Sequence, residues 1–305
     1  MKILLTGGLG HIGSYLINYL KNIKNIKKIY LIDNLSNDRF DVLFNIKNKK
    51  IHFIYGDLTN KNFCKTLPKA DLVIHLASIT NAEKSLQYKK NIYFNNLETF
   101  KNIIKFCKKF NSKLIHFSST SVYGPQKGIV NENQQKLLPQ SPYAEVKLLE
   151  EKILSKQNKI KYISLRLGTI SGFSQGMRFH TAVNKFCFNA VMSLPIPIWD
   201  NALNLFRPYL SLKDLLKTIK YILKNNFFPN DIFNIISENK TVKQILKIIE
   251  NKNIKIKKKF ITSKISQKTS FMTSKEKIEK FNLKLNAKIA DDIFYTIKRL
   301  KNEKI

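Results

Sequence analysis

Residues 6–14 read Thr6-Gly7-Gly8-Leu9-Gly10-His11-Ile12-Gly13-Ser14 and follow directly on an apolar run, Lys2–Thr6, with the composition of a β-strand. Four of the ten glycines of the chain fall in this stretch. Glycines spaced three residues apart allow a tight turn, close approach of the backbone to a pyrophosphate, and close packing of the next helix. The free N–H groups and positive dipole end of that helix favour phosphate oxygens. The stretch therefore predicts a dinucleotide-binding turn rather than an ordinary glycine turn.

The segments that follow this turn predict an α/β fold built on a doubly wound parallel sheet. Apolar β-type runs alternate with amphipathic segments of helix length, which is typical of βαβ units, and right-handed crossovers place the helices on both faces. The expected strands are Lys2–Thr6, Lys28–Ile32, Ile51–Tyr55, Leu72–Leu76, Lys113–Ser118 and Tyr162–Leu167. The expected helices are His11–Asn22, Asn60–Leu67, Lys89–Phe110 and Tyr143–Gln157.

After Gly172 the alternation loosens, which indicates a smaller, mixed C-terminal lobe. We expect residues 1–170 to form the Rossmann-type nucleotide-binding domain and residues 171–305 a substrate lobe whose segments interleave with the sheet domain. The expected elements are helices over Met177–Met192, Asp214–Lys224, Val242–Glu250, Lys275–Phe281 and Ile289–Lys301, and short strands over Phe206–Leu210 and Ile232–Ile236.

The composition limits the class of protein. With 305 residues, 43% of them apolar, the chain can bury a substantial core, which excludes intrinsic disorder. It contains no run of eighteen apolar residues, so no membrane span is expected, and the N-terminus lacks the pattern of a secretion signal. The three cysteines, Cys64, Cys107 and Cys187, are scattered and odd in number, so we expect neither a disulfide framework nor a metal site. These features favour a cytoplasmic protein.

The net charge of +33 raises the question of nucleic-acid binding. Only five of the 54 basic residues are arginine, and asparagine and isoleucine are also abundant, which is the bias of an A/T-rich genome. Readers of nucleic acid usually rely on arginine for bidentate contacts, and the lysines here are spread along the whole chain. We therefore interpret most of the charge as solvated surface and expect no nucleic-acid partner.

Acidic residues after the second and third expected strands are candidate contacts of an adenosine group. Asp33, followed by Asn34, lies where a carboxylate meets the ribose hydroxyls, and its charge repels a 2′-phosphate, so NAD is favoured over NADP. Asp57, followed by Leu58, is placed to reach the adenine edge. The alternative for Asp57 is a helix cap, since aspartate is favoured at that position.

A tyrosine followed four residues later by a lysine puts both side chains on one face of a helix. Twelve tyrosines in so lysine-rich a chain give roughly two such pairs by chance, so local context must decide between them. Tyr143 follows Ser141-Pro142, which is a good helix start, and leads into an amphipathic segment that contains Lys147. The competing pairs are Tyr123/Lys127, which meets the helix-stopping Gly124-Pro125, and Tyr209/Lys213, which lies in a strand-like run.

Hydroxyl residues end the fifth expected strand, in Ser118-Ser119-Thr120-Ser121. The carboxyl end of a parallel strand faces the crevice where ligands bind. Alone, these serines could be turn residues. Because Tyr143 and Lys147 follow some 24 residues later, we favour an active site.

Together these motifs resemble the extended short-chain dehydrogenase/reductase family, and within it the nucleotide-sugar epimerases and dehydratases, such as UDP-glucose 4-epimerase. The matching stretches occur in the family's order across nearly the whole chain: TGGLGHIGS (6–14), IDN (32–34), GDL (56–58), VIHLAS (73–78), FSSTSVYG (117–124), PYAEVK (142–147), RLGTISG (166–172), RPYLSLKD (207–214) and SKEKIEKFNL (274–283).

The resemblance implies a catalytic set of Ser119, Tyr143 and Lys147, with Tyr143 as general base. Lys147 would lower the pKa of the phenol and hold the nicotinamide ribose, since a free tyrosine titrates near pH ~10. Arg207 would bind the substrate diphosphate through its guanidinium fork. The implied cofactor is NAD, bound by Gly7, Gly10, His11, Ile12, Gly13, Asp33, Asn34, Asp57, Leu58, Leu76, Ala77, Ser78, Asn96, Tyr143 and Lys147. The implied substrate residues are Ser119, Thr120, Thr169, Arg178, Asn184 and Arg207, with a helix cap or core position as the alternative for Arg178 and Asn184.

Departures from the family's pattern narrow the reaction. Dehydratases carry an Asp-Glu pair where this chain has Thr120 and Ser121, and neither hydroxyl is a general acid near neutral pH, so dehydration is disfavoured. One type of epimerase/reductase in the family carries cysteine at the position of Ser121, so that type is disfavoured as well. Many 4-epimerases carry asparagine at Thr169, so the usual UDP-hexose contact is absent here.

The resemblance thus implies NAD-dependent epimerisation of a nucleotide-diphosphate sugar, at C4 through a transient 4-keto sugar, by a homodimer that supplies surface polysaccharide precursors. The alternatives are a dehydrogenase, reductase or dehydratase of the same family. A non-catalytic NAD- or RNA-binding protein is a third possibility, but such a protein has no need of a tuned phenol.

Overall fold

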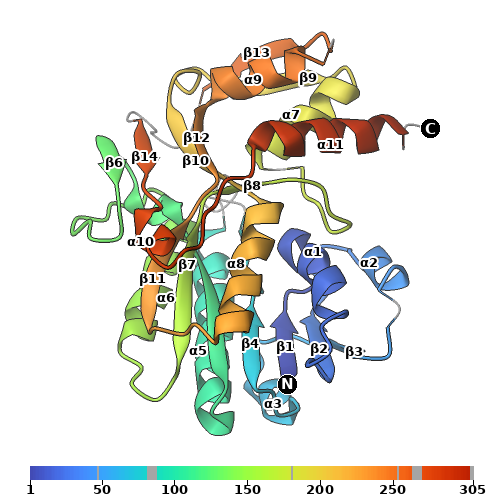
Figure 1. The fold of residues 1–305 in the computed structure, drawn as a ribbon, viewed down its shortest axis with the longest axis vertical. Coiled ribbons are helices and arrows are strands. Elements are labelled where there is room, and N and C mark those ends of the chain that lie inside the picture. The colour runs from blue at the N-terminus through green and yellow to red at the C-terminus, as the bar shows by residue number, and fades with distance from the viewer. Residues whose placement is uncertain (47, 81–87, 180, 253, 263–269, 303–305) are drawn as a thin grey trace.

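A seven-stranded parallel sheet organises the chain in this computed structural model, which describes residues 1–46, 48–80, 88–179, 181–252, 254–262 and 270–302. The strand order is β11-β7-β5-β4-β1-β2-β3 (Figure 1). The expected α/β class and the doubly wound sheet are confirmed. The strands are β1 (Lys2–Thr6), β2 (Lys28–Asp33), β3 (Ile51–Tyr55), β4 (Leu72–His75), β5 (Lys113–Ser119), β7 (Tyr162–Leu167) and β11 (Asp231–Ile235).

Alternation along the strands explains why both faces of the sheet carry helices. Ile3 and Leu5 of β1 face one core, whereas Leu4 faces the other, because side chains point alternately to opposite faces. Helices α1 (His11–Leu20), α2 (Asp41–Phe44) and α8 (Leu212–Asn225) pack on the first face. Helices α3 (Lys61–Thr66), α5 (Lys89–Phe110) and α6 (Pro142–Ser155) pack on the second.

A second core lies at the carboxyl end of the sheet, at the top of Figure 1. It is formed by helices α7 (Ala182–Val191), α9 (Val242–Glu250) and α11 (Ile289–Asn302) with strand β9 (Pro195–Trp199). Helix α8 and strand β11 follow residue 170 in the chain but pack with the main sheet. The chain therefore passes between the two expected parts more than once.

The described residues also form three small sheets, of which the one containing β10 joins the main sheet to the second core through Leu210 and Tyr209. Their strand orders are β12-β10-β8, β13-β9 and β14-β6. The additional strands are β6 (Gly128–Val130), β8 (Thr169–Ser171), β10 (Phe206–Ser211), β12 (Glu238–Thr241), β13 (Lys257–Ile261) and β14 (Phe271–Thr273), and the short helices are η1 (Thr120–Tyr123) and α10 (Glu276–Glu279).

Several expected helices were too long, and two of them differ most from the structure. The helix predicted over Met177–Met192 begins only at Ala182, because Arg178 is held away from it by a hydrogen bond to Thr80. The segment predicted as a helix over Lys275–Phe281 forms a single turn, Glu276–Glu279. Strands β6 and β14 were not predicted, since each has three residues and needs a partner about 140 residues away in the chain.

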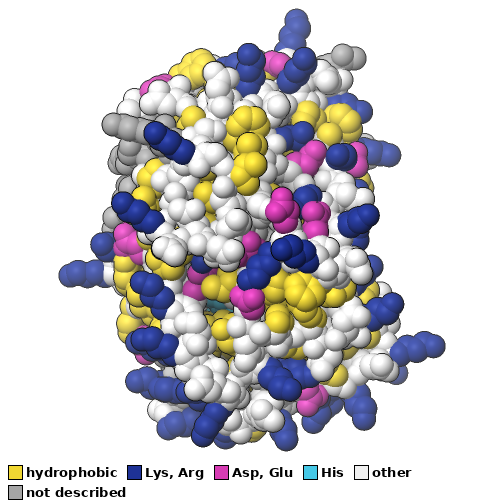
Figure 2. All heavy atoms as spheres, turned by 60° about the vertical axis from the view of Figure 1, so that its left-hand side comes forward, with side chains coloured by type: hydrophobic (Ala, Val, Ile, Leu, Met, Phe, Trp, Pro, Cys, Tyr) yellow, Lys and Arg dark blue, Asp and Glu magenta, His cyan; other side chains and the backbone are white. Residues whose placement is uncertain are grey.

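The surface agrees with the interpretation of the charge as solvated. Figure 2 shows Lys and Arg side chains scattered over the whole visible face rather than gathered in one stripe. Within the described ranges, no helix combines the length and apolar character needed to cross a bilayer.

Candidate active site

A cavity of about 780 Å³ opens at the carboxyl ends of the parallel strands, between the sheet and the second core. Residues that follow β1, β2, β4 and β5 line one part of it, including Gly7, Asp33 and Ala77. Residues from the C-terminal half of the chain, including Trp199 of β9 and Arg207 of β10, line the rest. A single cavity is therefore bounded on one side by the carboxyl edge of the sheet and on the other by the C-terminal half of the chain.

The glycine-rich turn has the geometry of a phosphate cradle. Gly7 adopts φ +63°, and a Cβ there would lie 2.6 Å from the backbone nitrogen of Ala77, so a side chain cannot be accommodated. Gly10 is the N-cap of α1, and because it is a glycine, no side chain of its own caps the first N–H groups of the helix. The first N–H groups of α1 are thus directed to the cavity, where they fit the pyrophosphate of a dinucleotide.

The acidic residues of the cofactor region are fixed by backbone donors. Asp33 accepts hydrogen bonds from the N–H groups of Leu9 (3.2 Å) and Leu35 (3.0 Å) at the end of β2. Asp57 accepts one from Thr59 at 2.8 Å, whereas the cap of α3 is Asn60, so the helix-cap alternative for Asp57 is wrong. Both carboxylates line the cavity and fit ribose and adenine groups.

Ser119 ends β5 and presents its hydroxyl to the cavity. Its Oγ accepts hydrogen bonds from the backbone N–H (3.2 Å) and the hydroxyl (2.9 Å) of Ser121, which fix its orientation. Ser119 lies close enough to the phenol of Tyr143 to lower its pKa. The strand thereby places a hydroxyl beside the phenol, as a catalytic pair requires.

Tyr143 and Lys147 lie one turn apart on α6, which begins where the sequence indicated. The Ser141 side chain caps the helix by accepting from the N–H of Ala144, and Pro142 occupies its first turn. The Lys147 ammonium is 5.9 Å from the centre of the Tyr143 ring. Burial raises the pKa of Tyr143 above its ordinary value, and the Lys147 and Arg178 cations oppose this rise.

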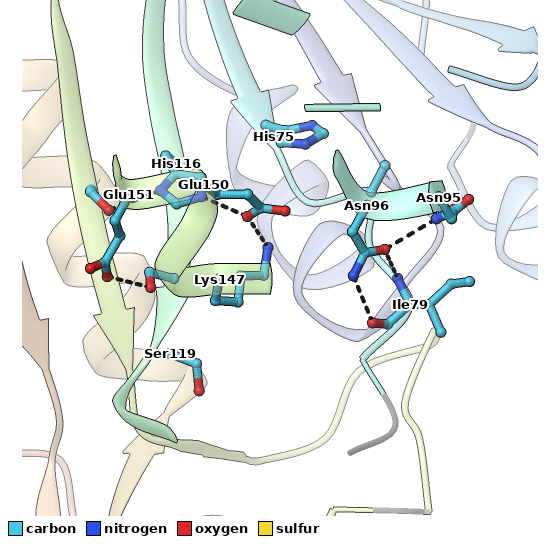
Figure 3. A network of polar contacts seen from close by, with 12 residues as sticks. His75, Ile79, Asn95, Asn96, His116, Ser119, Lys147, Glu150 and Glu151 are labelled. Atoms are coloured by element: carbon cyan, nitrogen blue, oxygen red, sulfur yellow. Dashed lines mark hydrogen bonds and ion pairs between the residues drawn. The ribbon is translucent and has the colours of Figure 1, made fainter. Parts of the chain in front are cut away.

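Behind this pair lies a buried polar network, drawn in Figure 3. The Lys147 ammonium donates to Glu150 (2.8 Å), and the same carboxylate oxygen accepts from His116 (2.9 Å). The neighbouring Glu151 pairs instead with Arg166, at 2.7 and 2.9 Å. Each of the two buried carboxylates in this network therefore has a basic side chain beside it.

Two arginines face the cavity from the second half of the chain. Arg178 donates to the Thr80 hydroxyl at 2.7 Å, and a Cβ on Gly10 would lie 3.8 Å from its guanidinium. It is thus placed between the glycine-rich turn and Tyr143. Arg207 lies 5.7 Å from the ring centre of Phe271 and donates to the carbonyl of Phe206, and burial lowers its pKa. Both can meet phosphate or carboxylate oxygens.

The cavity brings together nearly all of the predicted site residues. Its lining includes Gly7, Gly10, His11, Ile12, Gly13, Asp33, Asn34, Asp57, Leu58, Leu76, Ala77, Ser78, Ser119, Thr120, Tyr143, Lys147, Thr169, Arg178 and Arg207.

Asn96 and Asn184 are the exceptions, since both are buried outside the lining. The Asn96 amide exchanges two hydrogen bonds with the backbone of Ile79 (2.8 and 3.1 Å), and the Asn184 amide donates to the Arg178 carbonyl (3.4 Å). In the structure both amides hold the backbone of the cavity wall, and the cofactor contact predicted for Asn96 and the substrate contact predicted for Asn184 stay predictions.

Sequence reasoning missed several residues of the site. Arg39, which donates to the Gly176 carbonyl at 2.6 Å, and Thr80 line the cavity from loops without a recognisable pattern. Glu150 carried a signal that was overlooked, because it lies three residues after Lys147 on a predicted helix. His116 could have been found as a polar residue within an otherwise apolar strand.

The comparisons with known proteins agree with this geometry. A family model described as NAD dependent epimerase/dehydratase family matches residues 3–235. The uncharacterized UDP-glucose epimerase YtcB of Bacillus subtilis (strain 168) is 30% identical over 264 residues, which cover 82% of each chain. The UDP-glucose 4-epimerase GEPI42 of Cyamopsis tetragonoloba is 34% identical over 164 residues, which cover 50% of this chain and 45% of that protein. The crystal structure of UDP-glucuronic acid 4-epimerase from Bacillus cereus with UDP-glucuronic acid and NAD shares the fold, with a TM-score of 0.88 at 23% identity over 99% of both chains.

Proposed function

Since the chain belongs to the NAD dependent epimerase/dehydratase family, we propose that it interconverts the C4 epimers of a nucleotide-diphosphate sugar through a transient 4-keto sugar. NAD is the cofactor of this family, and the resemblance found in the motifs is confirmed. The observation that carries the proposal is the meeting of Ser119, Tyr143 and Lys147 in the same cavity as the glycine-rich turn.

In this reaction Tyr143 takes the proton of the sugar 4-hydroxyl and returns it to the same oxygen after the 4-keto sugar has turned and its other face has been reduced. Ser119 donates a hydrogen bond to the same sugar oxygen and orients it toward the phenol. Lys147 favours the phenolate by its charge, because an opposite charge nearby stabilises the ionised form. NAD, when bound, supplies the hydride acceptor for the oxidation and the donor for the reduction that follows.

The residues around Ser119 favour epimerisation over water loss. Thr120 donates to the Leu167 carbonyl at 3.2 Å, and Ser121 donates to Ser119, so both hydroxyls have structural partners. Among the described residues of the lining, the carboxylates are Asp33 and Asp57, both on the cofactor side. Dehydration needs a general acid beside the sugar, and neither aspartate supplies it.

The second core supplies the substrate pocket in this proposal. Arg207 binds the diphosphate, and Arg178 and Thr169 contact the sugar end. Apolar side chains that line the same region, Trp199 and Phe271 among them, provide surfaces for a nucleotide base.

We also propose that the enzyme is a homodimer formed through helices α5 and α6. These helices pack on each other and carry large exposed apolar side chains, including Phe94 (61% exposed) and Leu149 (36% exposed). Burial of such groups against a second copy is favourable. We place the enzyme in the cytoplasm, where its three free thiols persist, and propose a role in surface polysaccharide precursor synthesis.

The test is a panel of UDP-, GDP-, CDP- and dTDP-sugars incubated with the purified protein, with products identified by mass spectrometry and NMR. We expect a product of unchanged mass with altered ring proton couplings at C4. Loss of water or of two hydrogens would overturn the proposal in favour of a dehydratase or a net dehydrogenase.

A further inference from the structure

Glu150 is the feature of the site that the proposed chemistry does not use. Its carboxylate is 1% exposed and lies between two basic side chains, Lys147 (4% exposed) and His116 (0% exposed). The same oxygen, Oε2, accepts from the Lys147 ammonium at 2.8 Å and from Nε2 of His116 at 2.9 Å. Figure 3 shows the side chains of His116, Glu150 and Lys147 meeting, with Lys147 and Glu150 pointing toward each other.

We propose that Glu150, held by His116, forms with it a positioning pair that partly neutralises the ammonium of Lys147 and thereby weakens the positive charge that Tyr143 experiences. This inference rests on the proposed function, because it assigns Tyr143 the role of base. It adds residues that do not touch the substrate and that act through Lys147.

The hydrogen bonds define how the pair is held. A carboxylate only accepts, so Nε2 of His116 must carry a hydrogen. The other ring nitrogen, Nδ1, contacts the Ser164 hydroxyl on β7 at 2.8 Å. His116 is thus fixed at both nitrogens within the sheet, and it fixes Glu150 from the side opposite to Lys147. A lysine ammonium has three N–H donors, so two remain for the phenol and for a ribose.

The next residue on the helix, Glu151, offers a comparison, because it is also a buried carboxylate but has different partners. Glu151 is as deeply buried as Glu150, but it faces Arg166 and accepts a hydrogen bond from Ser118. It makes no hydrogen bond to Lys147 among the contacts of the described residues. Glu150 and Glu151 are therefore two buried, paired carboxylates on one helix, of which Glu150 contacts the lysine of the site.

The charges around the pair set the direction of its effect. Burial would raise the pKa of Glu150, but Lys147 and His116 lower it to about 2, so it is an anion at neutral pH. Its charge raises the pKa of Tyr143, which Lys147 and Arg178 lower. His75 of β4 also lies near, with its pKa lowered to about 3 by burial, so it is neutral. Phe100 of α5 separates the His75 and His116 rings, with centroids 5.8 and 4.9 Å from its own.

The test is a direct titration of the Tyr143 phenol by NMR in protein with ¹³C-labelled tyrosine, with Tyr143→Phe used to assign its signal. Glu150→Gln keeps the shape of the side chain and removes its charge. We expect the Tyr143 midpoint to fall by about one pH unit in Glu150→Gln, because a nearby anion no longer opposes ionisation. The matched control is Glu151→Gln, which removes an equally buried charge and should leave the midpoint within a few tenths of a unit.

A second variant keeps the inference falsifiable if Glu150→Gln folds poorly. His116→Asn leaves the carboxylate in place but loosens it, and we expect a smaller shift in the same direction. A Tyr143 midpoint in Glu150→Gln no lower than in the native protein, or an equal fall in Glu151→Gln, would overturn the positioning role. The titration needs no substrate, so its outcome is independent of whether the protein proves to be an epimerase.

Discussion

Gly176 lies directly on the backbone of Leu9, so that a Cβ at position 176 would come within 2.2 Å of the Leu9 carbonyl oxygen. The contact joins a loop of the second half of the chain to the glycine-rich turn. Further hydrogen bonds hold it there: the Gly176 N–H donates to the Ser14 hydroxyl at 2.9 Å, and Arg39 donates to the Gly176 carbonyl. The loop that carries Arg178 is therefore docked on the phosphate cradle.

A side chain at position 176 should displace this loop. For Gly176→Ala we expect unfolding at lower temperature, with a loss of about 1–3 kcal/mol, because overpacking forces the backbone apart. We also expect less NAD to remain with the purified protein. Differential scanning calorimetry and cofactor content measure the two effects, with the adjacent exposed Gln175→Ala as control. Native-like stability and cofactor content in Gly176→Ala would contradict the close contact.

The preference for NAD should depend on Asp33. Its carboxylate is fixed beside the glycine-rich turn by the N–H of Leu9, and Arg39 lies close enough to sense its charge. Asp33→Asn removes the repulsion of a 2′-phosphate and leaves Arg39 to attract it, so we expect the ratio of NADP to NAD affinity to rise at least about tenfold. Binding titrations with both cofactors measure it, and Asp57→Asn serves as control. An unchanged ratio in Asp33→Asn would refute the assignment of the ribose site.

Asp292 should make stability depend on pH. Burial raises its pKa to about 6, although Ser171 and Ser211 donate hydrogen bonds to it at 2.6 and 3.0 Å. The folded state binds this proton more tightly than the unfolded state does, so its contribution is present below pH 3.8 and is lost as the pH rises to about 6.

The expected loss is on the order of 2–3 kcal/mol in the free energy of unfolding. Between pH 4 and pH 6.5 the free energy of unfolding of Asp292→Asn should rise relative to that of the native protein, as measured by urea unfolding. Asp291→Asn, at the exposed neighbouring position, should show no such gain. Parallel pH profiles for the native protein and Asp292→Asn would exclude the effect.

The proposed dimer can be tested at its apolar surface. The double variant Phe94→Asp/Leu149→Asp places charges on α5 and α6, and we expect it to sediment as a monomer where the native chain sediments as a dimer. Tyr295→Asp, on α11, changes an equally exposed aromatic residue and should leave the assembly intact. A monomeric native protein, or a dimeric double variant, would count against the α5–α6 interface.

Most of the sheet could be predicted because its strands are buried on both faces and its helices are amphipathic. The helix Lys89–Phe110 was predicted with both ends correct, and each expected strand of the main sheet ends within one residue of the observed position. The glycine spacing and the Ser141-Pro142 helix start are also local signals, and both lead to residues that line the cavity.

The remaining features depend on contacts between distant segments. Strand β14 exists only because β6 lies beside it, and Arg178 leaves the helical path to reach Thr80. Asn96 and Asn184 are polar residues in family positions, but sequence alone does not say whether an amide faces a cavity or the backbone behind it. In the structure both amides are buried and hydrogen-bond to the backbone of neighbouring segments.

The most direct test of the account follows a deuterium atom placed at C4 of the nucleotide sugar that the panel identifies. If Tyr143 removes the hydroxyl proton while the C4 hydrogen leaves as hydride and returns, the product keeps the deuterium with inverted configuration. Tyr143→Phe should then lose at least about 100-fold in turnover while still binding NAD. Exchange of the deuterium with solvent, or near-native turnover by Tyr143→Phe, would contradict the proposed epimerisation.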